Sequence, residues 1–523
     1  MKIIRLTQLA LIFAPIFTLM TITGCSSSEP LELRIPDGPL VGETDGETRV
    51  FLGVPFAEPP LGALRFAPPT PPAPWTSPRE ATESAPRCAQ LDSDDPSRVN
   101  EDSSEDCLYL NIWAPEGKGP FPVLLFIPGG GYLHGGNDEP LYDGAHLSKM
   151  GEQIVIVANY RLGPFGFLAH EEMIAEHGPK SANLGLLDQR AALEWIHRNI
   201  AAFAGDPENI TLAGNSSGAG SVCFHLVSSD SQSLFRRAIM QSPICSGVPH
   251  PSLAHSLSRR DDLASALGCA DLSCIRERSS EDILKALPNK ERYFVGEGVN
   301  WLPIIDGEFL TESPAELLRA GAAESIPILT GSTEDEGTYF IEEGSIRDHD
   351  ELFELVADAF GSDEAAELLA YHAGDNKSPE RIATDIISDL FTCDARRLAR
   401  AHQEAGGRVY HYHFTRADFD LFAGLGAYHS AEMVYLFNTP IYGFRISPVG
   451  FPLARAIQRY FSGFIRTGTP TGAEPAWPAY SAASPQSMRL DLELSIAEDV
   501  RRERCDFMDI IMRGSGFTYN GGD

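Results

Sequence analysis

Runs of hydrophobic residues in the middle of the chain follow two patterns, one typical of buried strands and the other of helices. Residues 123–127 and Ile154–Ala158 are continuously apolar, without the alternation of a strand that has one face in water. Between residues 183 and 199, apolar positions instead recur three and four residues apart, which predicts an amphipathic helix. Strands and helices therefore alternate from residue 123 onward, the pattern of a mostly parallel sheet covered by helices on both faces.

Other segments extend this alternation. Strands are expected at residues 210–213, 238–241, 326–330 and Val409–Phe414, and a closing helix at residues 452–467. Residues 279–401 are helical and less regular in pattern, and we expect them to form a lid or side lobe. The predicted fold class is α/β, with a central, mostly parallel sheet, helices on both faces and a helical side lobe.

The part of the chain before residue 123 has the signals of a β-rich opening. Residues 30–65 contain turn signals at Asp37-Gly38 and Asp45-Gly46, and residues 68–78 are rich in proline. A length of 523 residues allows up to three domains, but large α/β enzymes often fold as one. We therefore expect a single domain over residues 31–523.

The first residues predict export. Lys2 and Arg5 precede an apolar run, residues 9–20, that is too short to span a bilayer and leads to Ile22-Thr23-Gly24-Cys25. This tetrapeptide resembles the lipobox of bacterial lipoproteins, which implies a signal peptide over residues 1–24, lipidation of Cys25 and a tether over residues 25–30. Ser26 favours the outer membrane, by the convention for such lipoproteins. The alternative is an ordinary secretory signal peptide, with the mature protein periplasmic or secreted.

Charge narrows the choice of partners. The chain has 73 acidic and 41 basic residues, a net charge of −32 at pH 7. Such a surface repels nucleic-acid phosphates and anionic lipids. We therefore expect no nucleic-acid partner, and membrane attachment only through an N-terminal lipid; the oligomeric state stays open.

The nine cysteines fit an exported protein, because Cys25 leaves an even number of others. Cys223 and Cys245 are expected to be buried thiols. No CxxC pair and no Cys/His cluster has the spacing of metal ligands, so the sequence predicts no metal site.

The strongest candidate chemistry lies at Gly214-Asn215-Ser216-Ser217-Gly218, between an expected strand and an expected helix. Glycine on both flanks permits the sharp turn of a nucleophile elbow, which exposes the serine hydroxyl. The N-terminus of the following helix presents positive charge at the same place. In a chain with 47 glycines the bare pattern is a weak signal, so a turn without function is the alternative at this point.

Three loops that follow expected strands carry complementary groups. Pro128-Gly129-Gly130-Gly131 exposes backbone N–H groups, as in an oxyanion hole or simply in a flexible loop. Asp335 and Glu336 follow one later strand, and His429 lies in a glycine-containing loop after another. Loops after parallel strands meet at one edge of a sheet, where a serine, its base and an orienting acid can converge. Spacing alone does not choose between Asp335 and Glu336.

Several separate motifs make the chain similar to a known family. They are Ser104-Glu105-Asp106-Cys107-Leu108-Tyr109-Leu110-Asn111, Asn159-Tyr160-Arg161-Leu162-Gly163, Asn183-Leu184-Gly185-Leu186-Leu187-Asp188-Gln189, Gly205-Asp206-Pro207, the turn at Ser216, Asp335-Glu336-Gly337 and Ala427-Tyr428-His429. In this order they resemble the motifs of type-B carboxylesterases, an α/β-hydrolase family that includes cholinesterases and bacterial p-nitrobenzyl esterases. The likeness extends over residues 41–507.

This resemblance implies an α/β-hydrolase fold and the hydrolysis of small to medium carboxylic esters through an acyl-enzyme, without a cofactor. Carried over to this sequence, the nucleophile is Ser216, the base is His429 and the acid is Glu336. The resemblance also implies oxyanion donors in the N–H groups of Gly130, Gly131 and Ser217, a serine that supports the acid at Ser242, and the disulfides Cys88–Cys107, Cys269–Cys274 and Cys393–Cys505.

Departures from the family pattern argue against a cholinesterase. Asn215 replaces the usual Glu beside the nucleophile, and the segment between Cys88 and Cys107 has no Trp to stack on a quaternary ammonium group. Pro128 is a further departure, which affects the stiffness of the glycine loop. Hydrolysis of a lactone, a thioester or a natural-product ester such as a mycotoxin stays open, because the pocket decides the substrate. The other alternative is a non-catalytic binding or adhesion relative, although such members usually lack the nucleophile.

Overall fold

The computed structural model describes residues 29–246, 250–287, 301–374, 377–417, 424–440 and 445–514. The expected signal peptide, Cys25 and most of the expected tether lie outside these ranges. Within them, every helix is too short or too polar to cross a bilayer.

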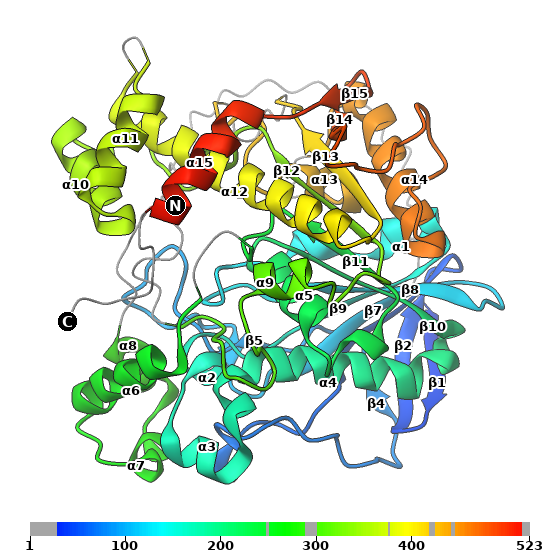
Figure 1. The fold of residues 1–523 in the computed structure, drawn as a ribbon. Coiled ribbons are helices and arrows are strands. Elements are labelled where there is room, and N and C mark those ends of the chain that lie inside the picture. Colours follow the sequence, from blue (N-terminus) through cyan, green and yellow to red (C-terminus); the bar gives the residue numbers. More distant parts are fainter. Residues whose placement is uncertain are drawn as a thin grey trace, which may run out of the picture.

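A sheet of 13 strands forms the centre of the molecule (Figure 1). Along the sheet the strand order is β1-β2-β3-β7-β9-β8-β10-β11-β12-β13-β14-β15, and β4 pairs with β2. From β9 to β14 every neighbouring pair is parallel, and antiparallel strands extend the sheet at both edges. The bounds are β1 Glu29–Ile35, β2 Gly38–Thr44, β3 Thr48–Pro55, β4 Arg79–Glu80, β7 Tyr109–Pro115, β8 Phe121–Ile127, β9 Ile154–Ala158, β10 Gly205–Asn215, β11 Arg237–Gln241, β12 Ile328–Thr333, β13 Val409–Phe414, β14 Gln486–Leu490 and β15 Ser495–Glu498. The expected mostly parallel central sheet is confirmed.

Helices lie on both sides of this sheet (Figure 1). Their bounds are α1 Ala145–Gly151, α2 Gly163–Phe167, α3 Glu171–His177, α4 Leu184–Asn199, α5 Ser217–Val227, α6 Leu253–Leu267, α7 Leu272–Glu277, α8 Ser280–Ala286, α9 Pro314–Arg319, α10 His349–Phe360, α11 Ser362–His372, α12 Pro379–Glu404, α13 Ala431–Phe437, α14 Phe451–Thr467 and α15 Arg502–Gly514. A separate two-stranded sheet joins β5 (Arg87–Cys88) to β6 (Ser103–Ser104).

Strand β8 shows why its sequence is apolar throughout. Leu125 and Ile127 belong to a core shared with α4 and α5, whereas Leu124 and Phe126 belong to a second core shared with α13 and α14. Successive side chains of a strand point to opposite faces of the sheet. A strand between two helical layers therefore has no polar face.

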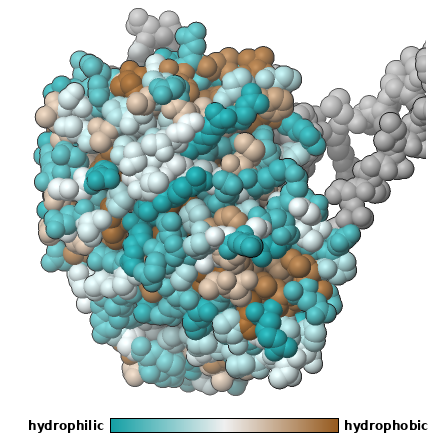
Figure 2. Space-filling model, turned by 90° about the vertical axis from the view of Figure 1, so that its right-hand side faces the viewer, coloured by the Kyte–Doolittle hydropathy of each residue, from teal (hydrophilic) through white to brown (hydrophobic). Residues whose placement is uncertain are grey.

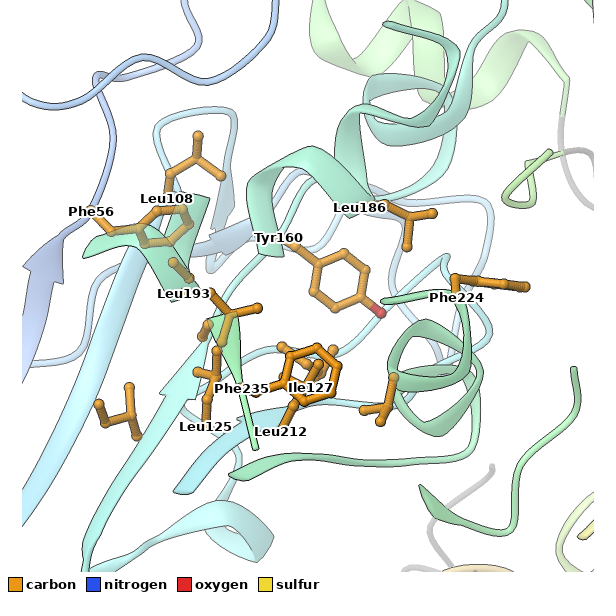
Figure 3. Close-up of a cluster of buried hydrophobic side chains, with 14 of the residues drawn as sticks. Phe56, Leu108, Leu125, Ile127, Tyr160, Leu186, Leu193, Leu212, Phe224 and Phe235 are labelled. Carbon is orange, nitrogen blue, oxygen red and sulfur yellow. The ribbon is translucent and has the colours of Figure 1, made fainter. Parts of the chain in front are cut away.

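The first of these cores also holds the glycine loop that follows β8. Figure 3 shows the ring of Tyr160 among buried side chains that include Ile127 and Leu212. The Tyr160 hydroxyl donates a hydrogen bond of 3.2 Å to the carbonyl oxygen of Pro128. The residue that precedes the three glycines is thus anchored to the hydrophobic core.

A group of helices packs around a third core, and it is the expected side lobe. Helices α10, α11 and α15, at the upper left of Figure 1, share this core with α12. The range predicted for the lobe also contains β12, which belongs to the central sheet. Helix α14 matches the expected closing helix, but the chain continues into β14, β15 and α15, so α14 is not the last element.

Four disulfide bonds link the described residues. Three are the pairs that the family resemblance implies, Cys88–Cys107, Cys269–Cys274 and Cys393–Cys505. The fourth joins Cys223 to Cys245, so the expectation of two buried thiols was wrong. Helix α5 packs against β11, which brings the two Cα atoms within 6.4 Å, a separation that a disulfide spans. Disulfides in this number are typical of exported proteins.

The surface reflects the excess of acidic residues. The face shown in Figure 2 is mainly hydrophilic, with hydrophobic side chains confined to limited areas. At a net charge of −32, copies of the chain repel one another electrostatically.

Candidate active site

Ser216 lies in the sharp turn between β10 and α5. Its backbone has φ 57° and ψ −127°, a conformation that costs a non-glycine residue about 1–3 kcal/mol. The turn is possible only because the residues two positions before and after Ser216 are glycines. A Cβ on Gly214 would lie 2.4 Å from the carbonyl carbon of Gly218. A Cβ on Gly218 would lie 2.1 Å from the carbonyl oxygen of Ile127. This is the strained backbone geometry of a nucleophile elbow, and Ser216 is half-buried.

Glu336 follows β12 and begins the short 3-10 helix Glu336–Tyr339. Its side chain is fully buried. One oxygen, Oε1, accepts hydrogen bonds from the Ser242 hydroxyl at 2.6 Å and from the N–H of Thr333 at 2.7 Å. The other oxygen, Oε2, lies 2.5 Å from Nδ1 of His429. Both carboxylate oxygens are therefore engaged, and the carboxylate faces the imidazole with one of them.

His429 is buried at the end of the loop that precedes α13. Its bond to Glu336 assigns the ring proton to Nδ1, because a carboxylate accepts rather than donates. The rings of Phe340 and Phe391 flank the imidazole, with centroids at 5.0 and 4.7 Å. The second ring nitrogen, Nε2, is buried and has no hydrogen-bond partner among the described residues. It is therefore available as a proton acceptor.

Adjacent residues tie the serine turn to the histidine loop. The hydroxyl of Ser430 donates a hydrogen bond of 2.6 Å to Oδ1 of Asn215, so the neighbour of His429 binds the neighbour of Ser216. The N–H of Ser216 also donates to the carbonyl oxygen of Gln241 at 2.9 Å, which fixes the turn to β11. Within the described ranges, the Ser216 hydroxyl and His429 form no hydrogen bond with each other. In enzymes without substrate this contact is often long.

The glycine loop passes directly over the serine turn. A Cβ on Gly129 would lie 3.1 Å from Cβ of Ser216. Gly130 and Gly131 have positive φ angles, 117° and 64°, which turn the backbone sharply. In the described part of the chain no acceptor engages their N–H groups. These donors, together with the N-terminus of α5 at Ser217, are placed to bind an anion beside Ser216.

A second buried carboxyl group, that of Glu432, lies near the carboxyl group of Glu336, and it was not among the residues predicted from the sequence. Its Oε1 accepts hydrogen bonds from the hydroxyl of Tyr412 at 2.9 Å and from the side-chain amide of Gln241 at 3.3 Å. Burial, and after it the charge of Glu336, raise the pKa of Glu432 to about 7, against the opposing hydrogen bond from Tyr412. The available signal was an acidic residue within the otherwise apolar helix Ala431–Phe437.

Metal ligands are not grouped in this region. Over the described ranges no set of three or more His, Cys, Asp or Glu side chains is arranged to hold a metal ion. The polar groups of the site instead match those of covalent acyl transfer, with a serine, an oriented imidazole and backbone donors.

Fold and site together define a serine hydrolase of the α/β-hydrolase class. The model of the carboxylesterase family matches residues 29–508, and the chain belongs to that family. The motif resemblance is thereby confirmed.

Known relatives are similar over most of their length. An acetylcholinesterase of Bungarus fasciatus is 34% identical over 88% of this chain and 82% of its own, and a cholinesterase of Mus musculus is 32% identical over 88% and 83%. Among solved structures, a PNB esterase is 32% identical with a TM-score of 0.80, over 91% of this chain and 99% of that one. A thermophilic PNB esterase is 30% identical with the same TM-score and coverage.

Proposed function

We propose that Ser216, His429 and Glu336 are the catalytic triad with which this carboxylic-ester hydrolase cleaves small to medium esters. The observation that carries the proposal is the 2.5 Å contact between His429 Nδ1 and Glu336 Oε2, which leaves Nε2 without a partner in the described part of the chain. A base oriented in this way beside an elbow serine is what acyl transfer requires.

The reaction proceeds in two halves. His429 Nε2 takes the hydroxyl proton of Ser216 as Oγ attacks the ester carbonyl carbon, and the carbonyl electron pair moves onto oxygen. This intermediate collapses, the alcohol leaves with the proton from His429, and the acyl group stays on Ser216. Water then gives a proton to His429 and attacks the acyl carbon. The bond from that carbon to Ser216 Oγ breaks as His429 returns the proton to Oγ, which releases the acid and restores Ser216. Glu336 stabilises the imidazolium in both halves.

The oxyanion is bound by backbone donors. We assign this role to the N–H groups of Gly130, Gly131 and Ser217, each of which contributes about 3 kcal/mol to lowering the barrier. The N-terminus of α5 adds positive potential at the same position.

Substrate choice follows from the side chains around the serine. Asn215 provides no negative charge beside Ser216, and the segment closed by Cys88–Cys107 has no Trp. Although relatives are named acetylcholinesterase and cholinesterase, we therefore propose neutral esters rather than quaternary ammonium esters as substrates.

Covalent labelling tests the triad directly. The purified protein is treated with a fluorophosphonate probe, and label is expected on wild type and absent from Ser216→Ala. Turnover of a p-nitrophenyl ester series, from acetate to decanoate, is measured in parallel with turnover of choline esters. The p-nitrophenyl esters of short and medium chain length are expected to be hydrolysed faster than the choline esters. Label or turnover that survives in Ser216→Ala would refute the assignment of the nucleophile.

We also propose that the mature chain is a lipoprotein anchored through Cys25 to the outer membrane. The four disulfides support export, and the lipobox-like tetrapeptide supports lipidation. Radiolabelled palmitate is expected to enter wild type but not Cys25→Ala, and the variant is expected to leave the membrane fraction. Equal labelling of both proteins would exclude this anchor.

A further inference from the structure

Asp335 precedes Glu336 in the chain but binds a different partner. Its N–H donates a hydrogen bond of 2.9 Å to the carbonyl oxygen of Ala427, and its Oδ2 accepts one of 3.0 Å from the N–H of Ala427. Two reciprocal bonds therefore join Asp335 to the residue two positions before His429.

The loop that carries His429 depends on such contacts. Residues 424–430 contain no helix or strand of their own, and a segment of this kind is fixed only by what it touches. The hydroxyl of Thr338 lies 2.6 Å from the carbonyl oxygen of Leu425. Thr338 belongs to the 3-10 helix that follows Asp335, so this contact is a second link between that segment and the loop. A Cβ on Gly426 would lie 2.3 Å from Oδ2 of Asp335, so the carboxylate fills the inside of the loop.

Among the described residues, no other side-chain contact accounts for the position of the Asp335 carboxylate. The nearest cation is the guanidinium of Arg381 at 4.0 Å, on a side chain that is 53% exposed, and a surface pair of this kind contributes little. Its neighbour Glu334 points elsewhere, to His413 at 2.5 Å and Arg501 at 3.0 Å. Three consecutive acidic residues thus have three separate partners, and of these three only Asp335 binds the backbone of the histidine loop.

We propose that Asp335 is a positioning residue for His429. It fixes the backbone before the imidazole, so that Nε2 stays directed at the serine turn while Nδ1 stays on Glu336. This inference rests on the proposed triad. Displacement of a reacting group by about 1 Å costs on the order of 100-fold in rate, so loss of this tie acts on kcat rather than on substrate binding.

Steady-state kinetics with p-nitrophenyl butyrate test the proposal. Asp335→Ala is expected to lower kcat about 10- to 100-fold, with KM changed less than about threefold. Asp335→Asn keeps an oxygen that accepts from the N–H of Ala427 and is expected to restore kcat to within about threefold of wild type. The matched control is Glu334→Gln, which touches no residue of the loop and is expected to keep kcat within about twofold of wild type.

A second readout separates positioning from loss of folding. The rate at which a fluorophosphonate labels Ser216 is expected to fall in Asp335→Ala by the same factor as kcat, while near-UV circular dichroism stays that of wild type. Thr338→Val replaces by a methyl group the hydroxyl that contacts the carbonyl oxygens of Asp335 and Leu425. It is expected to lower kcat in the same direction, and it serves where Asp335→Ala does not fold.

The outcomes distinguish this inference from the proposed function. If Asp335→Ala, or Thr338→Val in its place, keeps the labelling rate and kcat of wild type, the positioning role is overturned while the triad stands. If Asp335→Asn falls as far as Asp335→Ala, the hydrogen-bond account is overturned as well. If Ser216→Ala keeps full activity, the triad itself is wrong.

Discussion

Ser242 donates a hydrogen bond of 2.6 Å to Oε1 of Glu336, the carboxylate oxygen that His429 does not use. The N–H of Thr333 binds the same oxygen at 2.7 Å. These two donors leave Oε2 to the imidazole and fix the plane of a carboxylate that is fully buried. Ser242 itself has φ 50°, a strained value for a residue other than glycine.

Ser242→Ala is expected to loosen the acid without removing it. A hydrogen bond to a charged group contributes about 1.5–3 kcal/mol, and loss of about half of that in the transition state corresponds to a kcat about tenfold lower. The control is Ser148→Ala, since Ser148 is equally buried and donates only to the carbonyl oxygen of Trp113 at 3.1 Å. Kinetics and urea unfolding of both variants check this. Equal kcat values in the two would show that Ser242 does not orient Glu336.

Gly218→Ala is expected to disable the elbow by steric conflict. The added methyl group would lie 2.1 Å from the carbonyl oxygen of Ile127, at the end of β8, and that backbone cannot move without displacing the sheet. Overpacking of this kind costs about 1–3 kcal/mol or more, and activity is expected to fall with thermal stability. Gly46→Ala is the control for an added methyl group without steric conflict, because it meets no atom within 4 Å; its positive φ of 83° adds a backbone strain that Gly218, inside α5, does not have. A Gly218→Ala enzyme as active and stable as Gly46→Ala would contradict the packing argument.

Continuous apolar runs predicted most strands of the sheet. The strands that were not predicted contain polar residues or are short and partly exposed. β8 and β9 were expected because nothing polar interrupts them. β7 was not, since it carries Asn111 inside a buried strand. The structure explains that residue: its amide binds the N–H of Gly53 and the carbonyl oxygen of Asn137 at 3.0 Å each. β14 and β15 were missed because they are short and partly exposed.

Motifs identified the candidate residues of the site, but not their relations in space. Spacing left Asp335 and Glu336 equivalent, and the choice of Glu336 came from the family resemblance; the structure separates the two by the direction of each side chain after β12. Cys223 and Cys245 looked like separate buried thiols, because pairing depends on how α5 packs on β11. Glu432 belongs to no sequence motif. Its hydrogen-bond partner Tyr412 lies on another element, so the sequence alone did not show that the two side chains meet.

The Cys223–Cys245 disulfide is expected to stabilise the enzyme without taking part in catalysis. It closes a loop with a sequence separation of 22, for which chain entropy gives about 3 kcal/mol. Replacing both cysteines by serine is expected to lower the free energy of unfolding in urea by that amount. The same change at Cys269 and Cys274, which are separated by 5, is expected to cost about 2 kcal/mol. A smaller loss at the longer loop than at the shorter one would refute the entropic account.

Glu432 is expected to make stability fall as pH rises. Burial, together with the charge of Glu336, raises its pKa from 4.5 to about 7 in the folded state. Below pH 4.5 both folded and unfolded chains hold the proton, so the group costs nothing. Between that pH and about 7 the unfolded chain releases a proton that the folded chain keeps, and the loss reaches about 3 kcal/mol. The free energy of unfolding of Glu432→Gln, which cannot ionise, is therefore expected to rise relative to wild type from pH 5 to about pH 7 and then to level off, whereas exposed Glu324→Gln leaves the wild-type pH profile unchanged. A constant difference between Glu432→Gln and wild type across this range would mean that Glu432 is ionised in the folded enzyme.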